Sequence, residues 1–200
     1  MGRPRVHDDA TAQALLTAAE RIVEADGVEA LTVRRVADAV GVSTRAVYST
    51  LGSKEALLTA LGELAFDTLG ALVDALPRTA DPAADLVSAG YDGFRAFAVG
   101  HPALFRIGVQ LTDAPPESRA AIRAAARRTL ATLHERIERL RASGGLDERP
   151  LRVATAQFHG TCEGLAALEL RGTFFEVGDA EQIWKGGLSA LVSGWRPAPA

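Results

Sequence analysis

Polar side chains that suit DNA recognition gather between residues 43 and 49. Only Ala46 and Val47 interrupt this run of hydrogen-bonding residues. Hydroxyl, phenol and guanidinium groups match the donors and acceptors on base edges and phosphates. A short helix with so many polar side chains gains little from packing, so we expect it to contact a polar partner. The DNA major groove is the partner that fits this chemistry best. The residues concerned are Ser43, Thr44, Arg45, Tyr48 and Ser49.

The surrounding sequence predicts the elements that hold this run in place. Residues 31–57 predict a helix, a tight turn, a second helix and the start of a third. Thr32 and Ser43 are favourable N-caps, and Gly41 allows the left-handed backbone that ends the first helix. Such a helix-turn-helix places the N-terminal part of its second helix in the major groove. The first helix has an apolar face of Val33, Val36, Ala37 and Val40.

A third helix is expected to begin after Ser53, with Lys54 in its first turn. A cation there opposes the helix dipole, but a DNA phosphate would satisfy both the lysine and the free N–H groups. The alternative is an exposed, solvated lysine. We predict that Arg45 reads a guanine and that Thr44 contacts a thymine methyl. We predict that Thr32, Tyr48 and Lys54 contact phosphates. The full set of predicted DNA-binding residues is Thr32, Arg34, Ser43, Thr44, Arg45, Tyr48, Ser49 and Lys54.

These motifs resemble the DNA-binding domain of the TetR (tetracycline-repressor-like) family of bacterial regulators. The matching residues are 32–40, the turn Gly41-Val42-Ser43, Tyr48 and the run Ser53-Lys54-Glu55-Ala56-Leu57. Leu51 stands where the family usually has Phe. The C-terminal part resembles the WHG-type ligand-binding domain of this family, at residues 101–106 and at Phe158-His159-Gly160. The resemblance implies an all-α fold, a homodimer and a small-molecule effector.

The net charge of −3 does not by itself indicate a nucleic-acid partner. The local charge between residues 32 and 54 is nevertheless +3, from four basic residues against Asp38, and local charge sets the field at a groove. The acidic residues of the N-terminal part, such as Glu20, Glu24, Asp26 and Glu29, can face away from DNA. The arm Met1–His7 carries Arg3 and Arg5, and it is either a disordered terminus or a segment that reaches DNA.

Composition and motifs also narrow the class of protein. The single cysteine, Cys162, allows no intramolecular disulfide. No apolar run long enough for a membrane span and no signal peptide is expected, which indicates a cytoplasmic protein without a membrane partner. The sequence has no nucleotide-binding loop, and its histidines lack metal-ligand spacing. We therefore expect no enzyme activity, no cofactor and no metal site.

The remainder of the chain is expected to be helical throughout. We predict a DNA-binding domain at residues 8–55 and a regulatory and dimerisation domain at residues 56–200, with no strand pattern in either. Helices are expected at about residues 84–99, 117–142, 151–170 and 180–195. The arginines of the helix 117–142 favour a solvated face rather than a second nucleic-acid surface, because no aromatic residues accompany them.

The last two helices predict an interface, although packing within one chain is the alternative. Glycines cost about 1 kcal/mol relative to alanine inside a helix, so their repetition needs a packing reason. A dimer would also read two half-sites, since one short helix covers few bases. The candidate interface residues are Gly160, Gly164, Leu168, Leu188, Leu191 and Trp195.

An effector pocket is expected inside the larger helical domain. For each aromatic candidate taken singly, packing in a plain core is the favoured alternative. The favoured alternative for His159 is a hydrogen-bonded interior histidine, and for Cys162 it is a small buried side chain. The candidates are Phe94, Phe97, Phe105, Gln110, Phe158, His159 and Cys162.

The combined prediction is a homodimeric, ligand-responsive repressor that binds a palindromic DNA operator. The alternative is a helical dimeric scaffold or ligand-binding protein whose DNA site is weak or lost.

Overall fold

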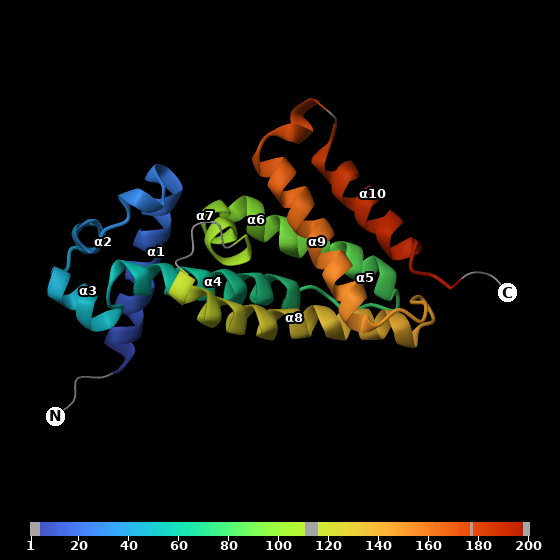
Figure 1. Ribbon diagram of the computed structural model, residues 1–200, viewed down its shortest axis with the longest axis horizontal. Coiled ribbons are helices and arrows are strands. Elements are labelled where there is room, and N and C mark those ends of the chain that lie inside the picture. The colour runs from blue at the N-terminus through green and yellow to red at the C-terminus, as the bar shows by residue number, and fades with distance from the viewer. Residues whose placement is uncertain (1–4, 111–115, 177, 198–200) are drawn as a thin grey trace. The chain divides into compact units, whose positions relative to one another are not determined.

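The computed structural model describes residues 5–110, 116–176 and 178–197, which form helices and no strand (Figure 1). The predicted all-α fold is confirmed. Short 3₁₀ turns lie at Val28–Ala30, Pro116–Ser118 and Thr173–Glu176, and π-helical segments lie at Ala89–Arg95 and Phe105–Val109. The α-helices are α1 (Arg5–Asp26), α2 (Val33–Val40), α3 (Thr44–Thr50), α4 (Lys54–Asp74), α5 (Pro82–Ser88), α6 (Ala96–Gly100), α7 (Pro102–Leu104), α8 (Arg119–Ala142), α9 (Leu151–Leu170) and α10 (Ala180–Ser193).

The chain divides into two compact units that interleave along the sequence. Unit 1 comprises Met1–Phe66 and Ala103–Ala125, and unit 2 comprises Asp67–Pro102 and Ala126–Ala200. Both α4 and α8 contribute residues to each unit. Unit 1 therefore groups the helix-turn-helix with the first half of α4 and with residues from the middle of the sequence. The domain boundary at residue 55 remains a prediction.

The core of unit 1 joins α1 to the helix-turn-helix. Leu31, Val36 and Val47 are fully buried, and they meet an apolar stripe on α1. That stripe consists of Leu15, Ala19, Ile22 and Val23. Helix α1 begins at Arg5, so the last residues of the predicted arm Met1–His7 are helical. The first residues of that arm lie outside the described part of the chain.

By length and composition, helix α4 is long and apolar enough to cross a membrane, contrary to the predicted absence of such a run. Many of its apolar side chains are buried within the two units, whereas Leu72 is exposed. Leu57, Leu61 and Ala65 lie in the core of unit 1, and Leu69 and Val73 lie in the core of unit 2. These side chains form the apolar face that α4 presents to the two cores.

The helix predicted at 84–99 contains a π-helical segment, Ala89–Arg95, between α5 and α6. Two glycines on this segment allow neighbouring side chains to approach closely. A Cβ at Gly93 would lie 2.8 Å from Val73 Cγ2, and a Cβ at Gly90 would clash with Leu188. Larger residues at either position would force α4 or α10 away from this segment. Sequence periodicity alone did not reveal this irregularity.

Helices α9 and α10 run side by side in unit 2 (Figure 1). Helix α9 has the predicted bounds, and α10 ends two residues earlier than predicted. Glu169 on α9 accepts three hydrogen bonds from Arg95, at 2.6 to 3.1 Å, and one from the indole of Trp184 at 2.7 Å. This half-buried carboxylate therefore ties α9 to α10 and to the π-helical segment.

One arginine of α8 is buried, contrary to the predicted solvated face. Arg136 is 1% exposed, and its Nη2 donates to the carbonyl oxygens of Val73 at 2.7 Å and Leu76 at 3.0 Å. Those carbonyls lie at the C-terminal end of α4, where a cation is favourable. Burial lowers the pKa of Arg136. The Nη2 bonds compensate for only part of this burial, because Nε and Nη1 are buried without a hydrogen-bond partner among the described residues.

Candidate nucleic-acid interface

The turn between α2 and α3 begins at Gly41, which was predicted to end the first helix of the motif. Gly41 adopts a left-handed conformation with φ of 75°. The Val42 N–H donates to Ala37 O at 3.0 Å, and the Gly41 N–H donates to Asp38 O at 3.3 Å. These two bonds form a Schellman motif, which satisfies the last carbonyls of α2. The turn therefore sets the direction in which α3 leaves α2.

Each helix of this region begins with a side-chain cap. Thr32 Oγ1 accepts from the Arg35 N–H at 3.1 Å, and Ser43 Oγ accepts from the Ala46 N–H at 3.2 Å. Ser53 Oγ accepts from Ala56 at 3.3 Å and donates to the Glu55 carboxylate at 2.7 Å. The bond from Ser53 lowers the pKa of Glu55. These caps fix the first turns of α2, α3 and α4.

The predicted DNA-binding side chains are accessible in the folded chain. Val47 is fully buried and anchors α3, whereas Tyr48 beside it is 59% exposed. Lys54 is half-buried, and the Ser49 hydroxyl donates to Ala46 O at 2.9 Å, so it keeps only acceptor capacity. Exposed positions are Thr32, Arg34, Ser43, Thr44, Arg45, Tyr48 and Ser49. The structure thus gathers these candidates on the exposed parts of α2, α3 and the start of α4.

Two acidic residues expected to face away from DNA lie beside basic residues of this region. Asp26 forms a hydrogen-bonded ion pair with Arg35. Glu29, in the 3₁₀ turn after α1, lies 3.8 Å from Lys54 Nζ. The turn after α1 thus brings both carboxylates close to basic residues of α2 and α4. Sequence periodicity could not show this, since Glu29 and Lys54 belong to different elements.

The aromatic candidates for an effector pocket are packed into the cores of their units. Phe94, Phe97 and Phe158 are at most 6% exposed in unit 2, and Phe105 is 1% exposed in unit 1. Gln110 is half-buried in unit 1. The geometry matches the plain-core alternative for these phenylalanines, so none of them is shown to contact an effector.

His159 and Cys162 lie on α9 with contrasting environments. The ring of His159 contacts that of Phe94 edge-on, with centroids 5.7 Å apart, and burial lowers the pKa of His159. Cys162 is fully buried, and burial raises the pKa of its thiol. A thiol in that state is a poor nucleophile, which agrees with a packing role.

A groove of about 520 Å³ lies between α8 and α9 within unit 2. Its walls carry Arg127 and Arg152, and His159 is the one effector candidate among its lining residues. Ala156 and Gly160 also line it, so the groove is continuous with the exposed face of α9.

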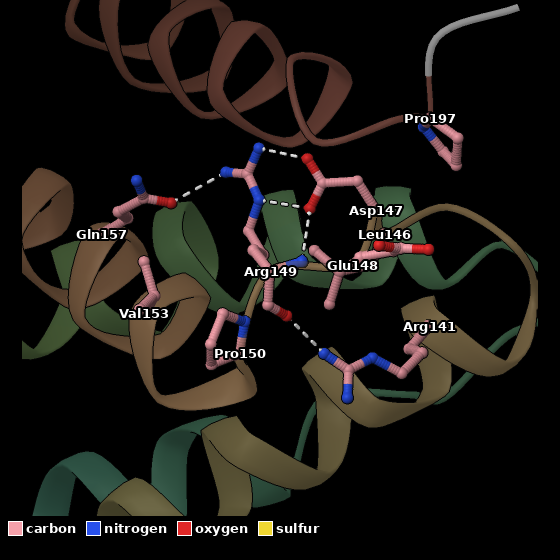
Figure 2. A pocket seen from close by; sticks show the side chains of 9 residues that line it. All are labelled: Arg141, Leu146, Asp147, Glu148, Arg149, Pro150, Val153, Gln157 and Pro197. Carbon is pink, nitrogen blue, oxygen red and sulfur yellow. Dashed lines mark hydrogen bonds and ion pairs between the residues drawn. The ribbon is translucent and has the colours of Figure 1, made fainter.

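A second hollow, of about 990 Å³, surrounds the loop between α8 and α9 (Figure 2). Arg149 donates to both oxygens of Asp147 at 2.6 and 2.7 Å and to Gln157 at 2.9 Å. Gln157 also accepts from the Trp195 indole at 3.1 Å, and Arg141 donates to Arg149 O at 2.7 Å. Because these groups satisfy one another, the network indicates a structural role in holding the loop to the C-terminal segment.

The predicted interface residues separate into exposed and buried sets. A Cβ added at Gly160 or Gly164 would meet no atom within 4 Å, and Leu168 is 36% exposed. Leu188 and Trp195 are instead buried within the chain, so their assignment to a dimer surface is wrong. Helix α10 turns its large residues inward, with Trp184 and Val192 in the same buried stripe, and Leu191 is half-buried. The exposed residues of α9 thus include the small residues Ala156, Gly160 and Gly164, beside the larger side chains of Leu168 and Leu170.

Comparisons with known sequences identify both parts of the chain. The model described as bacterial regulatory proteins of the tetR family matches residues 15–61, and the tetracyclin repressor-like C-terminal domain matches residues 87–191. The second match covers more than half of the chain. No curated protein matches the sequence.

Solved structures with low sequence identity share the fold. A Rhodococcus sp. RHA1 protein of unknown function has a TM-score of 0.81 at 21% identity, over 94% of this chain and 96% of that chain. The TetR family regulator PfmR from Thermus thermophilus has a TM-score of 0.68 at 23% identity, over 89% and 96%. FadR from Bacillus subtilis, in complex with stearoyl-CoA, has a TM-score of 0.75 at 19% identity, over 91% and 98%.

The helix-turn-helix and the helical C-terminal region together are typical of a DNA-binding regulator. This chain belongs to the TetR family. It is accordingly a DNA-binding transcriptional regulator and not an enzyme.

Proposed function

We propose that the protein is a homodimeric repressor that binds a palindromic operator and releases it when an effector binds. The observation that carries this proposal is the exposed polar surface of α3, held by the Ser43 cap and the Gly41 turn. Thr44, Arg45 and Tyr48 are all exposed there, although apolar packing buries Val47 on the same short helix. Such a surface suits hydrogen bonding in the major groove.

Each side chain has a distinct role in this proposal. Arg45 donates two hydrogen bonds to a guanine, and the Thr44 methyl group contacts a thymine. Thr32, Tyr48 and Lys54 bind phosphates and thereby set the register of α3 on the duplex. Two copies related by a two-fold axis would read half-sites about 34–36 Å apart.

The small-residue surface of α9 supports the homodimer. Gly160 and Gly164 leave open space around their backbone, which lets a helix of a second copy approach closely. The groove beside Ala156 and Gly160 extends this surface towards α8. A second copy that covers both features would bury apolar and backbone groups that are exposed in the single chain.

The proposed effector is a small apolar or amphipathic molecule. Support comes from the C-terminal domain match and from the similar Bacillus subtilis FadR, whose structure is a complex with stearoyl-CoA. An effector releases DNA only if it binds the non-DNA-binding conformation more tightly. The test is a screen for compounds that weaken operator binding by the purified protein. The absence of any such compound would contradict this part of the proposal.

Selection from a random DNA library tests the DNA-binding part directly. Purified full-length protein should enrich duplexes that contain an inverted repeat, at a stated salt concentration. The selected duplex then serves as the probe in all later binding measurements. A folded dimer that enriches no sequence would contradict the proposal and favour a helical scaffold with a lost DNA site.

A further inference from the structure

Two basic residues of the predicted DNA-binding segment have an exposed carboxylate beside them. Arg34 Nε lies 3.9 Å from Asp38 Oδ2, and Lys54 Nζ lies 3.8 Å from Glu29 Oε2. Both separations exceed the range of about 2.7–3.2 Å for an N–H···O hydrogen bond. The Glu29 side chain is 100% exposed, and the Asp38 side chain is 72% exposed. These are loose electrostatic pairs, and neither fixes the position of its cation.

The third pair of this segment is of a different kind. Arg35 is hydrogen-bonded to Asp26, and its Nη1 lies 3.5 Å from Ala30 O. It therefore joins α2 to the end of α1, and we assign it to the structure of unit 1. Arg45, by contrast, has no carboxylate partner among the residues that the structure describes.

We propose that Glu29 and Asp38 restrain sequence-independent DNA binding by partly neutralising Lys54 and Arg34. This inference rests on the proposed function of the same surface. A phosphate that contacts Lys54 Nζ must approach the Glu29 carboxylate, because both anions share one ammonium group. The same conflict arises between Asp38 and a phosphate at Arg34. Arg45 keeps its full charge for base recognition.

This arrangement separates affinity for the DNA backbone from the reading of bases. Non-specific binding depends almost entirely on phosphate neutralisation and counterion release. Carboxylates beside the phosphate-contacting cations therefore lower affinity for every sequence. The sequence preference comes from the contacts of Arg45 and Thr44 with base edges, and Glu29 and Asp38 do not pair with those residues.

Isosteric neutralisation tests the proposal in the full-length protein. The variants are Glu29→Gln, Asp38→Asn and the double variant, and Glu148→Gln is the matched control. Glu148 is an exposed carboxylate of unit 2 (Figure 2). Glu148→Gln therefore changes the net charge of the protein by the same amount as Glu29→Gln or Asp38→Asn. Binding is measured by fluorescence anisotropy with the selected operator and with a duplex that the selection depletes. Thermal unfolding confirms that each variant remains folded.

We expect Glu29→Gln and Asp38→Asn each to raise affinity for the depleted duplex about three- to tenfold near 50 mM salt, and by less near 200 mM. The slope of log K against log salt should become steeper by up to about one for each variant. Base preferences in a repeated selection should not change, and Glu148→Gln should behave as wild type.

Two results would overturn the inference while leaving the proposed function intact. If the wild type binds its operator but Glu29→Gln and Asp38→Asn match the control, the carboxylates do not restrain binding. If those variants lose affinity, the carboxylates position the cations instead. Failure of the wild type to bind any duplex would overturn both the proposed function and this inference.

Discussion

Arg45 and Lys54 are both basic, but their positions predict different effects on DNA binding. Arg45 projects from α3 with no paired carboxylate among the described residues, whereas Lys54 lies at the start of α4 beside Glu29. Arg45→Ala should cost about 1–3 kcal/mol on the selected operator and relax the preference at one base in each half-site. Lys54→Ala should weaken binding to all sequences alike and lower the salt slope by about one.

Repeated library selection and salt titrations with both variants check this assignment. The readout is the base preference at each operator position, together with the slope of log K against log salt. Uniform loss of affinity in both variants would show that Arg45 contacts phosphate rather than a base.

Asp147, in the loop between α8 and α9, makes a pH-dependent contribution to the stability of the protein. Hydrogen bonds from Arg149 lower the pKa of Asp147 to about 2. The pKa of Asp147 in the folded state lies below its value of about 3.9 in the unfolded state. Asp147 therefore stabilises the folded protein at a pH above about 3.9, and this contribution is lost as the pH falls through about 2. Asp147→Asn should therefore destabilise the protein near neutral pH and have progressively less effect in acid.

Urea unfolding of the wild type and Asp147→Asn at several pH values measures this difference. The difference in unfolding free energy should be constant above about pH 5 and should shrink below about pH 4. A difference that stays constant into strong acid would show that the Asn side chain perturbs the loop by another route.

At the scale of elements, Arg136 connects α8 to the end of α4 within unit 2. Arg136→Ala should destabilise the protein by about 2–4 kcal/mol, because it leaves a cavity and removes the hydrogen bonds to Val73 O and Leu76 O. Arg136→Met should cost less, since it retains much of the side-chain volume and removes a buried charge. Chemical denaturation of both variants provides the comparison. A methionine variant less stable than the alanine variant would contradict this account.

The helix ends within the helix-turn-helix were more predictable than the packing between distant elements. Thr32, Ser43 and Gly41 cap or end their helices as the sequence predicted, because these interactions join residues at most about five positions apart. The π-helical segment Ala89–Arg95 was not predicted, since its glycines meet residues of α4, α9 and α10. Close approach between distant elements leaves no periodic signal in the segment itself.

At the scale of the whole molecule, α9 provides a test of dimerisation. Gly164→Leu adds a side chain where the single chain has open space, so it should preserve the fold. In the proposed dimer it would separate the packed helices, and the dissociation constant should rise about tenfold or more, equivalent to about 1.4 kcal/mol. Gly100→Leu is the control. A Cβ at Gly100 also meets nothing within 4 Å, but Gly100 belongs to α6, outside the proposed dimer surface.

Analytical ultracentrifugation over a range of protein concentrations measures both dissociation constants. Circular dichroism shows whether each variant is folded. A folded Gly164→Leu protein that dimerises as tightly as the wild type would place the interface elsewhere.

The sequence by itself determined the helical fold class, the helix-turn-helix and the set of polar residues on α3. These features depend on local capping, periodicity and side-chain chemistry, which a linear sequence contains. Only the tertiary structure decided that Leu188 and Trp195 lie inside the chain, that Arg136 is buried, and that Glu29 lies beside Lys54. Each of these depends on which residues distant in sequence become neighbours, and burial and pairing energies follow from those neighbours.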